Sequence, residues 1–580
     1  MSERAAGVRP VDVRRSCCDN DEERCHTVPC RMIFWRVTIT HLLIIFTSAV
    51  RFSSHHHSGT RRATALTMSL IRSTGSTLSR VHPRPSYSHS RCYATEATSQ
   101  HKQRLVVLGT GWGGYAFLKS LSYPTLRRFD VKVISPTTSF SFTPLLAQAS
   151  CATLDFRSAI EPIHSNRWME YHHAWCDAVD FRKRKIELTS AFNPQFRLSD
   201  PLQSGAQPKE EGKRFTYSLD YDYLVMCVGS YNATFGTKGV KENALFLKDV
   251  GDARAIRWRI LGLFESANAK HHYYTSDGKQ MTTEQEEELR KLLSFVVVGG
   301  GPTGSEFAAE LHDLIKDDLA RLYPNLRSYP SIRLLDAGKS ILSSFDAGLA
   351  DYAMKKFARD GIQVRLSAKI KRVERDAVVL SSEEGVEEKL GAGMVVWSTG
   401  ITTSPLIEAF RGVGKEERTG KVLTNDTLNV LVSNSNSASL GGSVLNPSLY
   451  DSASQTDDLV PLDNVFALGD CSSQTSGALP ATAQVASQKG SYLASLFNTH
   501  ISQPSSEPPK PFKFLDKGSM ASIGSGKALI DSPVKKESGA LAWVLWRSAY
   551  TIMSMSWRNR FLVPANWASN ILFGRDVGRF

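Results

Sequence analysis

Short aliphatic and β-branched runs recur along the chain, and they predict buried strands of parallel sheets. Two of these runs, Arg104–Leu108 and Ser294–Val298, lead directly into glycine-rich turns. Each turn is followed by apolar residues at helical spacing, in Tyr115–Leu121 and Ser305–Leu314. Strand, glycine turn and helix in this order open a dinucleotide-binding fold. Because the order occurs twice, 190 residues apart, the sequence predicts two such α/β domains.

The first turn has a glycine for each requirement of a pyrophosphate site. Gly109 permits the tight turn, Gly111 lets the backbone approach the phosphates, and Gly114 lets the helix sit close to the strand. The next strand, Val131–Ile134, is followed by Ser135, where an acid that binds a ribose diol is usual. The ribose contact of this domain is therefore left open.

The second turn repeats the pattern with Gly299, Gly301 and Gly304, and here the next strand does end in an acid, Asp336. A carboxylate at this place accepts hydrogen bonds from both ribose hydroxyls and repels a 2′-phosphate, so we expect NADH to be preferred over NADPH. The alternative is that Asp336 only caps the next element, as Asp often does.

Further apolar strands end in glycine. Gly229 follows the run from Tyr223, Gly400 follows the run from Met394, and Asp470 comes directly after the run from Asn464 to Gly469. In this order, the segments resemble flavoproteins with two dinucleotide-binding domains, in which one flavin is bound and one pyridine nucleotide is transient. The resemblance implies that Gly229 and Gly400 lie at junctions between the domains and that Asp470 reaches the flavin's ribityl chain.

Composition narrows the functional classes. A hydrophobic share of 41% and a charged share of 22% describe a globular body, not a polytopic membrane protein. The net charge of +13 is concentrated at the N-terminus: residues 1–93 hold 14 Arg and 6 acids, which leaves 56 basic and 51 acidic residues in the remainder. A nucleic-acid partner is therefore not expected. The nine Cys include no Cys-x-x-Cys, so neither a disulfide framework nor a metal site is predicted.

The N-terminal segment, residues 1–93, has the composition of a mitochondrial targeting sequence. Between Glu23 and Glu96 there is no acid, while Arg, Ser, Thr and His are frequent. Arg91-Cys-Tyr-Ala94 resembles a processing site, and residues 1–67 could be an upstream extension. The alternative is a short membrane anchor from Met32 to Val50, which Arg36 and His41 interrupt.

The helical segment after Pro480 suggests how electrons leave the flavin. Disulfide reductases need paired cysteines near the first glycine turn, and this chain has none there; Cys471 is single and is interpreted as a buried packing residue. Gln484 and Gln488 lie four residues apart, so both amides project from one helix face. Small residues would leave room for a flat ring beside them: Ala483, Ala486 and Gly490. The simpler alternative is that two glutamines on a helix face solvent.

This Ala-Gln-x-x-x-Gln pattern closely resembles the quinone motif of type II NADH dehydrogenases, which are single-chain, non-proton-pumping enzymes. The resemblance covers most of residues 103–580. It implies that Gln484 and Gln488 flank ubiquinone, that Glu306 lies near the nicotinamide and the flavin, and that the loop with Thr143 and Pro144 lies near the flavin ring. For Glu306 the alternative is a carboxylate stabilised by the helix dipole. No Asp-x-Asp-x-Asp-Gly loop occurs, so the calcium-binding insert of some relatives is not expected.

The C-terminal segment, residues 511–580, is rich in aromatic and basic residues. Aromatic and sulfur-containing residues fall at three- and four-residue steps and define an aromatic face: Trp543, Trp546, Tyr550, Met553 and Trp557. With ten basic and four acidic residues, the segment fits a helix that lies in an anionic membrane interface. A helix that packs on the protein core or on a second copy is the alternative. No stretch is a clean span of a bilayer.

The expected architecture is therefore an FAD-binding domain, residues 103–246 and 406–502, interrupted by an NADH-binding domain, residues 247–405. A polar insert, residues 433–458, is expected to be a disordered surface loop. The expected function is transfer of two electrons from NADH through non-covalently bound FAD to ubiquinone, at the surface of the mitochondrial inner membrane. Two alternatives remain: a sulfide:quinone oxidoreductase, which needs a reactive cysteine near the flavin, and an apoptosis-inducing-factor-like flavoprotein with little turnover. The sequence does not show on which face of the inner membrane the protein lies, or whether it forms a homodimer.

Overall fold

The computed structural model describes residues 102–163, 168–191, 214–381, 385–433, 459–501, 508–554 and 556–578, all in one compact unit that begins at Thr98. The predictions for the targeting segment, for the alternative anchor and for insert residues 434–458 lie outside these described residues.

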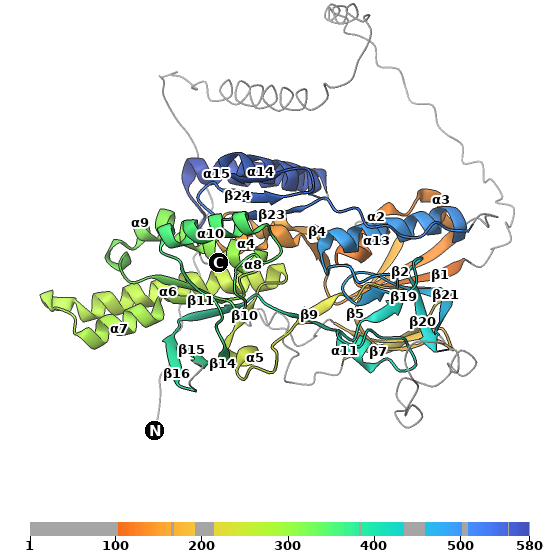
Figure 1. The fold of residues 1–580 in the computed structure, drawn as a ribbon, viewed down its shortest axis with the longest axis horizontal. Coiled ribbons are helices and arrows are strands. Elements are labelled where there is room, and N and C mark those ends of the chain that lie inside the picture. The colour runs from red at the N-terminus through yellow and green to blue at the C-terminus, as the bar shows by residue number, and fades with distance from the viewer. Residues whose placement is uncertain are drawn as a thin grey trace, which may run out of the picture. The chain divides into compact units, whose positions relative to one another are not determined.

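The domain that the sequence predicts to bind FAD, called the FAD-binding domain below, is built on a ten-stranded sheet with the order β22-β19-β20-β21-β8-β1-β2-β5-β6-β7. Its central strands are parallel and buried on both faces, which explains their continuous apolar runs. The strands are β1 (Gln103–Leu108), β2 (Phe129–Ser135), β5 (Met169–Asp180), β6 (Lys185–Ser190), β7 (Thr216–Asp220), β8 (Tyr223–Met226), β19 (Val422–Thr424), β20 (Asn429–Ser433), β21 (Leu459–Ala467) and β22 (Ser472–Gln474). Helices α2 (Trp112–Ser120) and α13 (Ala483–Leu496) pack against each other beside this sheet (Figure 1).

The domain that the sequence predicts to bind NADH, called the NADH-binding domain below, has a parallel five-stranded sheet with the order β10-β17-β11-β12-β13. The strands are β10 (Leu245–Phe246), β11 (Ser294–Val298), β12 (Ser331–Leu335), β13 (Gln363–Arg365) and β17 (Met394–Trp397). The long helix α6 (Val250–Tyr274), α8 (Pro302–Leu314) and α10 (Ala347–Asp360) flank it. A small antiparallel sheet joins it: β14 (Ile370–Glu374), β15 (Ala377–Ser381) and β16 (Glu387–Gly391).

The chain crosses between these two domains along a pair of short strands. Strands β9 (Ser230–Asn232) and β18 (Ile401–Thr403) are antiparallel neighbours. Each follows one of the predicted junction glycines, and both glycines have positive φ, +66° for Gly229 and +76° for Gly400. The ten-stranded sheet takes strands from both sides of this insertion, which confirms that the NADH-binding domain interrupts the FAD-binding domain.

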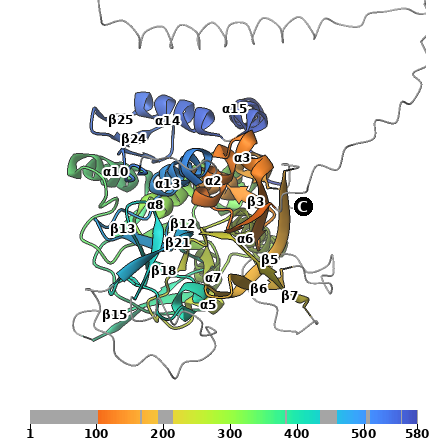
Figure 2. The same ribbon diagram turned by 90° about the vertical axis from the view of Figure 1, so that its right-hand side faces the viewer.

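The C-terminal domain consists of a three-stranded antiparallel sheet and two helices. These are β23 (Ser519–Ser522), β24 (Ala528–Asp531), β25 (Lys536–Gly539), α14 (Ala540–Met553) and α15 (Trp557–Phe573). In both views they form an outer layer on the side of the molecule where α10 lies (Figures 1 and 2). In the described parts of the chain, no helix is both long enough and apolar enough to cross a membrane.

The predicted aromatic face does not form a membrane-facing surface. Trp546 and Tyr550 belong to the core that joins the C-terminal and NADH-binding domains, and only Met553 and Trp557 at its end are exposed. The helix also ends at Met553, so Trp557 begins the next helix. The alternative, a helix packed on the protein, describes this face correctly, because large aromatic side chains gain most from burial in a core.

Candidate active site

The two glycine turns have the same backbone construction. Gly109 and Gly299 have φ of +93° and +107°. A Cβ added to Gly114 would lie 2.1 Å from the Gly109 carbonyl oxygen, and one added to Gly304 would lie 1.9 Å from the Gly299 oxygen. Only glycine at these places lets each helix approach its strand.

The middle glycines serve a different purpose. Gly111 and Gly301 are the residues that precede α2 and α8, and a Cβ added to either would meet nothing within 4 Å. Each turn therefore presents open backbone and a helix N-terminus, which is the surface that a pyrophosphate requires. Both turns fit dinucleotides.

The strand-end positions distinguish the two sites. Asp336 accepts hydrogen bonds from the backbone N–H of Gly300 (2.5 Å) and of Gly338 (2.6 Å), so its carboxylate lies against the second turn. Ser135 takes the equivalent place in the first turn, where the Thr110 hydroxyl contacts it at 2.8 Å. Only the second site therefore carries a strand-end charge.

Asp470 lies in the turn after β21 and is tied to the junction strand. Its carboxylate accepts a hydrogen bond from the Ser230 hydroxyl at 3.0 Å. Lys248 in turn donates to the Ser230 carbonyl and, at 3.3 Å, contacts the Ser230 hydroxyl. Burial lowers the pKa of Lys248. The sequence patterns missed Ser230 and Lys248, because only the folded junction brings them to Asp470.

The loop that contains Thr143 and Pro144 lies beside the first turn. The Trp112 indole, at the start of α2, donates to the Thr143 hydroxyl at 2.9 Å. The same ring packs on Phe140 and Phe142, with centroids 5.0 and 5.1 Å away. These contacts fix the loop at the expected cofactor end of the domain.

Both glutamine amides are held by the backbone of a linker. We call residues 512–518, which connect α13 with β23, the strap. Gln488 donates to the Leu515 carbonyl at 2.8 Å and accepts from the Leu515 N–H at 3.0 Å. Gln484 accepts from the Lys517 N–H at 2.8 Å. The two side chains are half-buried, so the solvent-facing alternative is wrong.

The space beside Gly490 of α13 is filled by helix α2, whereas the sequence predicted room for a ring there. A Cβ added to Gly490 would lie 2.3 Å from the Gly113 carbonyl oxygen of α2. Gly490 therefore permits close packing of two helices and leaves no room for a ring, which corrects the expectation. Ala483, the first residue of α13, stays half-buried at the helix N-terminus.

Glu306 lies beneath the C-terminal domain. It is 8% exposed, and its Oε1 atom accepts from the Ser522 N–H of β23 at 2.9 Å. Burial, partly offset by this hydrogen bond, raises its pKa to about 8. A helix dipole would lower the pKa, so the dipole alternative does not describe this acid.

More buried polar groups continue along the same helix face. Glu310 accepts from Thr153 at 2.8 Å and from Gln148 at 3.2 Å, and Asp313 accepts from Ser525. They connect α8 with both the FAD-binding domain and the C-terminal sheet. The sequence did not single them out, since acids on a helix usually face solvent.

The four described cysteines offer no reactive thiol. Cys471 is fully buried and donates to the Leu468 carbonyl at 3.3 Å, which confirms it as a packing residue. Burial raises its pKa to about 11. Cys151, Cys176 and Cys227 are likewise free, and burial raises their pKa values. This chemistry does not suit the sulfide-oxidising alternative.

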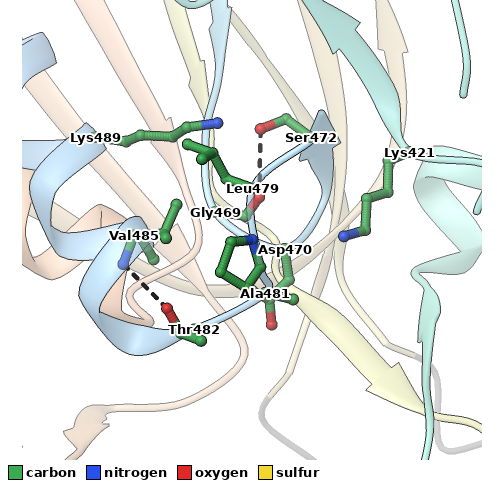
Figure 3. Close-up of a pocket in the computed structure, with 11 residues that line it drawn as sticks. Lys421, Gly469, Asp470, Ser472, Leu479, Ala481, Thr482, Val485 and Lys489 are labelled. Atoms are coloured by element: carbon green, nitrogen blue, oxygen red, sulfur yellow. Dashed lines mark hydrogen bonds between the residues drawn. The ribbon is translucent and has the colours of Figure 1, made fainter. Parts of the chain in front are cut away.

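A small pocket lies where the turn after β21 meets the start of α13 (Figure 3). Thr482 caps the helix by accepting a hydrogen bond from the Val485 N–H at 3.3 Å. The pocket is lined by Lys421, Gly469, Asp470, Ser472, residues 479–482, Val485, Ala486 and Lys489.

The chain is similar to known proteins over most of its length. The sequence profile of the pyridine nucleotide-disulphide oxidoreductase family matches residues 103–435, and the NDH2 C-terminal domain profile matches residues 517–576. A probable NADH dehydrogenase of Dictyostelium discoideum is 35% identical over 82% of this chain and 91% of its own length. The internal alternative NAD(P)H-ubiquinone oxidoreductase A1, mitochondrial, of Solanum tuberosum is 34% identical over 83% and 90%.

A solved structure shares the fold. NDH2 from Plasmodium falciparum, solved in complex with NADH, superposes with a TM-score of 0.67, covering 82% of this chain and all of that one, at 22% identity.

Proposed function

Because the chain belongs to the pyridine nucleotide-disulphide oxidoreductase family and, within it, to the type II NADH dehydrogenases, we propose that it transfers two electrons from NADH through FAD to ubiquinone. One observation carries this proposal: two glycine turns of identical construction occur in one chain, and only one has an acid at its strand end. Such a pair suits one resident and one exchanging dinucleotide.

The residues divide between the two nucleotides. We assign FAD to the first turn and the elements around it: Gly109, Gly111, Gly114, Thr143, Pro144, Gly229, Asp470 and Ala483. We assign NADH to the second turn and the adjoining junction: Gly299, Gly301, Gly304, Asp336 and Gly400. Bound FAD supplies the redox chemistry, accepting hydride and releasing electrons to the second substrate.

The protein's own groups bind, orient and supply protons. Asp336 accepts hydrogen bonds from the ribose hydroxyls of NADH and keeps a 2′-phosphate out. Glu306 holds a proton on Oε2 near neutral pH, because Oε1 faces the Ser522 N–H and burial disfavours the anion. We propose that this proton is available to quinone reduction.

The quinone site is proposed at the glutamine face of α13. Uncharged amides bind a quinone carbonyl without placing a fixed charge in an apolar pocket. In this structure, the two glutamine amides are hydrogen-bonded to the backbone of Leu515 and Lys517. A quinone carbonyl would therefore exchange with these strap contacts, since the amides' hydrogen-bonding capacity is already used.

Membrane attachment is proposed for the outer surface of α14 and α15. Large apolar side chains are exposed there: Leu541, Val544, Leu545, Ile552, Met553, Trp557, Phe561, Leu562, Ile571, Leu572 and Phe573. We call this the apolar face. A patch of this kind, with Arg558 exposed beside it, suits a helix pair that lies in the interface of an anionic bilayer. Because the relatives are named mitochondrial, we propose peripheral attachment to the mitochondrial inner membrane.

The test of the proposed function follows the flavin's absorption. The purified full chain should contain FAD, the yellow colour should bleach with NADH under anaerobic conditions, and it should recover when a soluble ubiquinone analogue is added. Bleaching without recovery would contradict ubiquinone as the acceptor and would favour a flavoprotein with little turnover. Sulfide in place of NADH should leave the colour unchanged.

A further inference from the structure

The side chain of Lys489 is buried and lines the small pocket beside α13, where no carboxylate of the described residues pairs with it. The residue is 2% exposed on the inner side of α13, and its ammonium makes no hydrogen bond or ion pair within the described ranges. Its nearest aromatic ring, that of Phe512, has a centroid 5.9 Å away, at the limit of a cation–π contact. An unpaired buried charge is costly to the fold, so this lysine is not explained by stability.

The groups that face Lys489 do not neutralise it. Asp470 lines the same pocket, but it lies beyond ion-pair distance and its carboxylate accepts from Ser230 instead. Lys421, at the opposite wall, has the same sign of charge. The Cys471 thiol is neutral, since burial raises its pKa to about 11. Burial and Lys421 together lower the pKa of Lys489 to about 8, so its charge is retained at neutral pH.

The place of this charge relates it to the cofactor. Its side chain extends from α13 toward the turn that carries Ser472, in the pocket that also contains Asp470 and the N-terminus of α13 (Figure 3). Asp470 and this N-terminus are the proposed FAD contacts. A helix N-terminus also favours negative charge, so two independent features of this pocket attract an anion.

We propose that Lys489 stabilises the negative charge that the flavin acquires when it is reduced by NADH, and thereby raises the reduction potential of the bound FAD. A hydride brings one proton and two electrons, so the ring gains one unit of negative charge while the nucleotide leaves as NAD⁺. In the oxidised protein the lysine lacks a partner, and reduction supplies one. The inference rests on the proposed function, because it requires FAD in the first nucleotide site.

The test replaces the charge and retains the shape. Methionine has an unbranched side chain of similar length, so Lys489→Met removes the ammonium with little change in packing. Lys421→Met is the matched control, because it removes a half-buried lysine from the opposite wall of the pocket. The FAD-loaded full chain of each protein is titrated spectroelectrochemically for its two-electron midpoint potential and is melted in the oxidised state.

We expect Lys489→Met to lower the midpoint potential of the flavin without lowering the stability of the oxidised protein. In Lys489→Met, the preference for reduced over oxidised flavin should fall at least tenfold, which is about 30 mV for a two-electron couple. The melting temperature of the oxidised protein should stay the same or rise, because an unpaired buried charge has been removed. Lys421→Met should change the potential by less than half as much.

The opposite pattern would overturn the inference. An unchanged potential in Lys489→Met, or an equal change in both variants, shows that the lysine does not act on the flavin. Failure of Lys489→Met and of a second variant, Lys489→Gln, to fold shows that the ammonium is a structural group. These outcomes differ from failure of the proposed function, in which the unaltered protein itself would lack FAD or would not be reoxidised by a ubiquinone analogue.

Discussion

Single residues at the ends of two strands give the nucleotide sites different chemistry. Ser135 is the last residue of β2 and Asp336 directly follows β12; both face a glycine turn, yet one contributes a hydroxyl and the other a carboxylate. The sequence predicted both positions, because each residue stands at the end of the strand that follows a glycine turn, although the second segment between turn and strand is longer. It could not predict the additional hydrogen bond to Gly338, which depends on how the following loop turns back.

Replacing Asp336 should relax the choice of nucleotide. In Asp336→Gln, the charge that repels a 2′-phosphate is lost. The two ribose hydroxyls then donate to a neutral amide instead of a charged carboxylate, which weakens both hydrogen bonds. The ratio of kcat/KM for NADH over NADPH should therefore fall by about tenfold or more, since hydrogen bonds to charged groups contribute about 1.5–3 kcal/mol. Steady-state rates with both nucleotides measure it. Asp351→Asn, an exposed acid of α10, is the control, and an unchanged ratio in Asp336→Gln would show that another group selects the nucleotide.

Glu306 should make stability depend on pH in a defined direction. Its pKa is raised to about 8 in the folded protein from an ordinary value of 4.5, so the folded state disfavours the anion. Stability is unaffected below the ordinary pKa, falls as pH rises between the two values, and is lowest above pH 8. Glu306→Gln should therefore match the original protein at pH 4 and exceed it at pH 9, by up to about 5 kcal/mol at 1.36 kcal/mol per pKa unit.

Thermal melting of both proteins across this pH range provides the measurement. Glu537→Gln removes a half-buried acid of the C-terminal sheet that pairs with Lys535, and this variant should not gain stability at high pH. A Glu306→Gln protein that is less stable at pH 9 than the original would show that the acid is held as an anion.

At the scale of elements, helix α13 and the strap are joined by side chains that sequence reasoning assigned only to a ligand. The four-residue spacing of Gln484 and Gln488 correctly predicted that they share a helix face. The spacing could not predict the contact with the strap, because the strap is an irregular segment that meets the helix only in the folded protein.

Gln488→Ala should impair ubiquinone reduction at least tenfold and leave anaerobic flavin reduction by NADH intact. The alanine removes the proposed carbonyl donor and also releases Leu515. Tyr492→Phe separates these effects. It removes the hydrogen bond from the tyrosine hydroxyl of the same helix to the Lys510 carbonyl (2.6 Å), just before the strap, and retains both glutamines. Stopped-flow measurement of the two half-reactions distinguishes them. Slower flavin reduction in Gln488→Ala would contradict the assignment.

Helices α14 and α15 show why their orientation was not predicted. Aromatic and aliphatic residues both occur at helical spacing in this segment, so the pattern allows two different inward faces. The structure places the aromatic side chains of Trp546, Tyr550 and Trp567 inside, where Arg547 stacks on Trp567 with its guanidinium 4.5 Å from the ring centroid. The aliphatic residues are left outside and form the apolar face together with Met553, Trp557, Phe561 and Phe573.

Membrane attachment should depend on the apolar face. Trp557 and Phe561 are 74% and 73% exposed, and the double change Trp557→Ser with Phe561→Ser removes apolar area that a bilayer would cover. Binding to vesicles that contain anionic lipid should weaken by about tenfold or more, at about 1.5–3 kcal/mol for each large side chain. Co-flotation measures it, with Val534→Ser as the control because Val534 is exposed in the turn between β24 and β25. Equal flotation of all three proteins would exclude this face.

At the scale of the whole molecule, the interrupted order of domains was predictable and the role of the C-terminal domain was not. Two glycine turns and later strand-and-glycine segments define the insertion from the sequence alone. The C-terminal domain was expected to face a membrane, but it also contacts both other domains. Asn559 and Asn566 bond to residues of the FAD-binding domain, and Arg575 pairs with Asp318 of the NADH-binding domain at 2.7 Å.

The buried tryptophan of this domain should therefore affect the stability of the whole protein. Trp546→Ala should cost about 3–5 kcal/mol, the usual range for emptying a core site of this size, and should lower the melting temperature of the complete chain. Trp557→Ala is the matched control, since that ring is exposed and its loss should change the melting temperature little. A separate early transition for the C-terminal domain, with the remainder unaffected, would show that the three domains do not share a core.

The paired crossing strands have a mechanical consequence. Because β9 and β18 are neighbours, both chain crossings between the inserted domain and its host lie side by side, while Glu310 and other buried groups of the insert contact the host elsewhere. The C-terminal domain also connects the two: Asn559 and Trp567 bond to the host, and Arg575 bonds to Asp318 of the insert, so a rotation of one domain against the other would break these hydrogen bonds. We therefore expect the two proposed nucleotide sites to keep a fixed separation, so that electron transfer between bound nucleotides would need no domain closure.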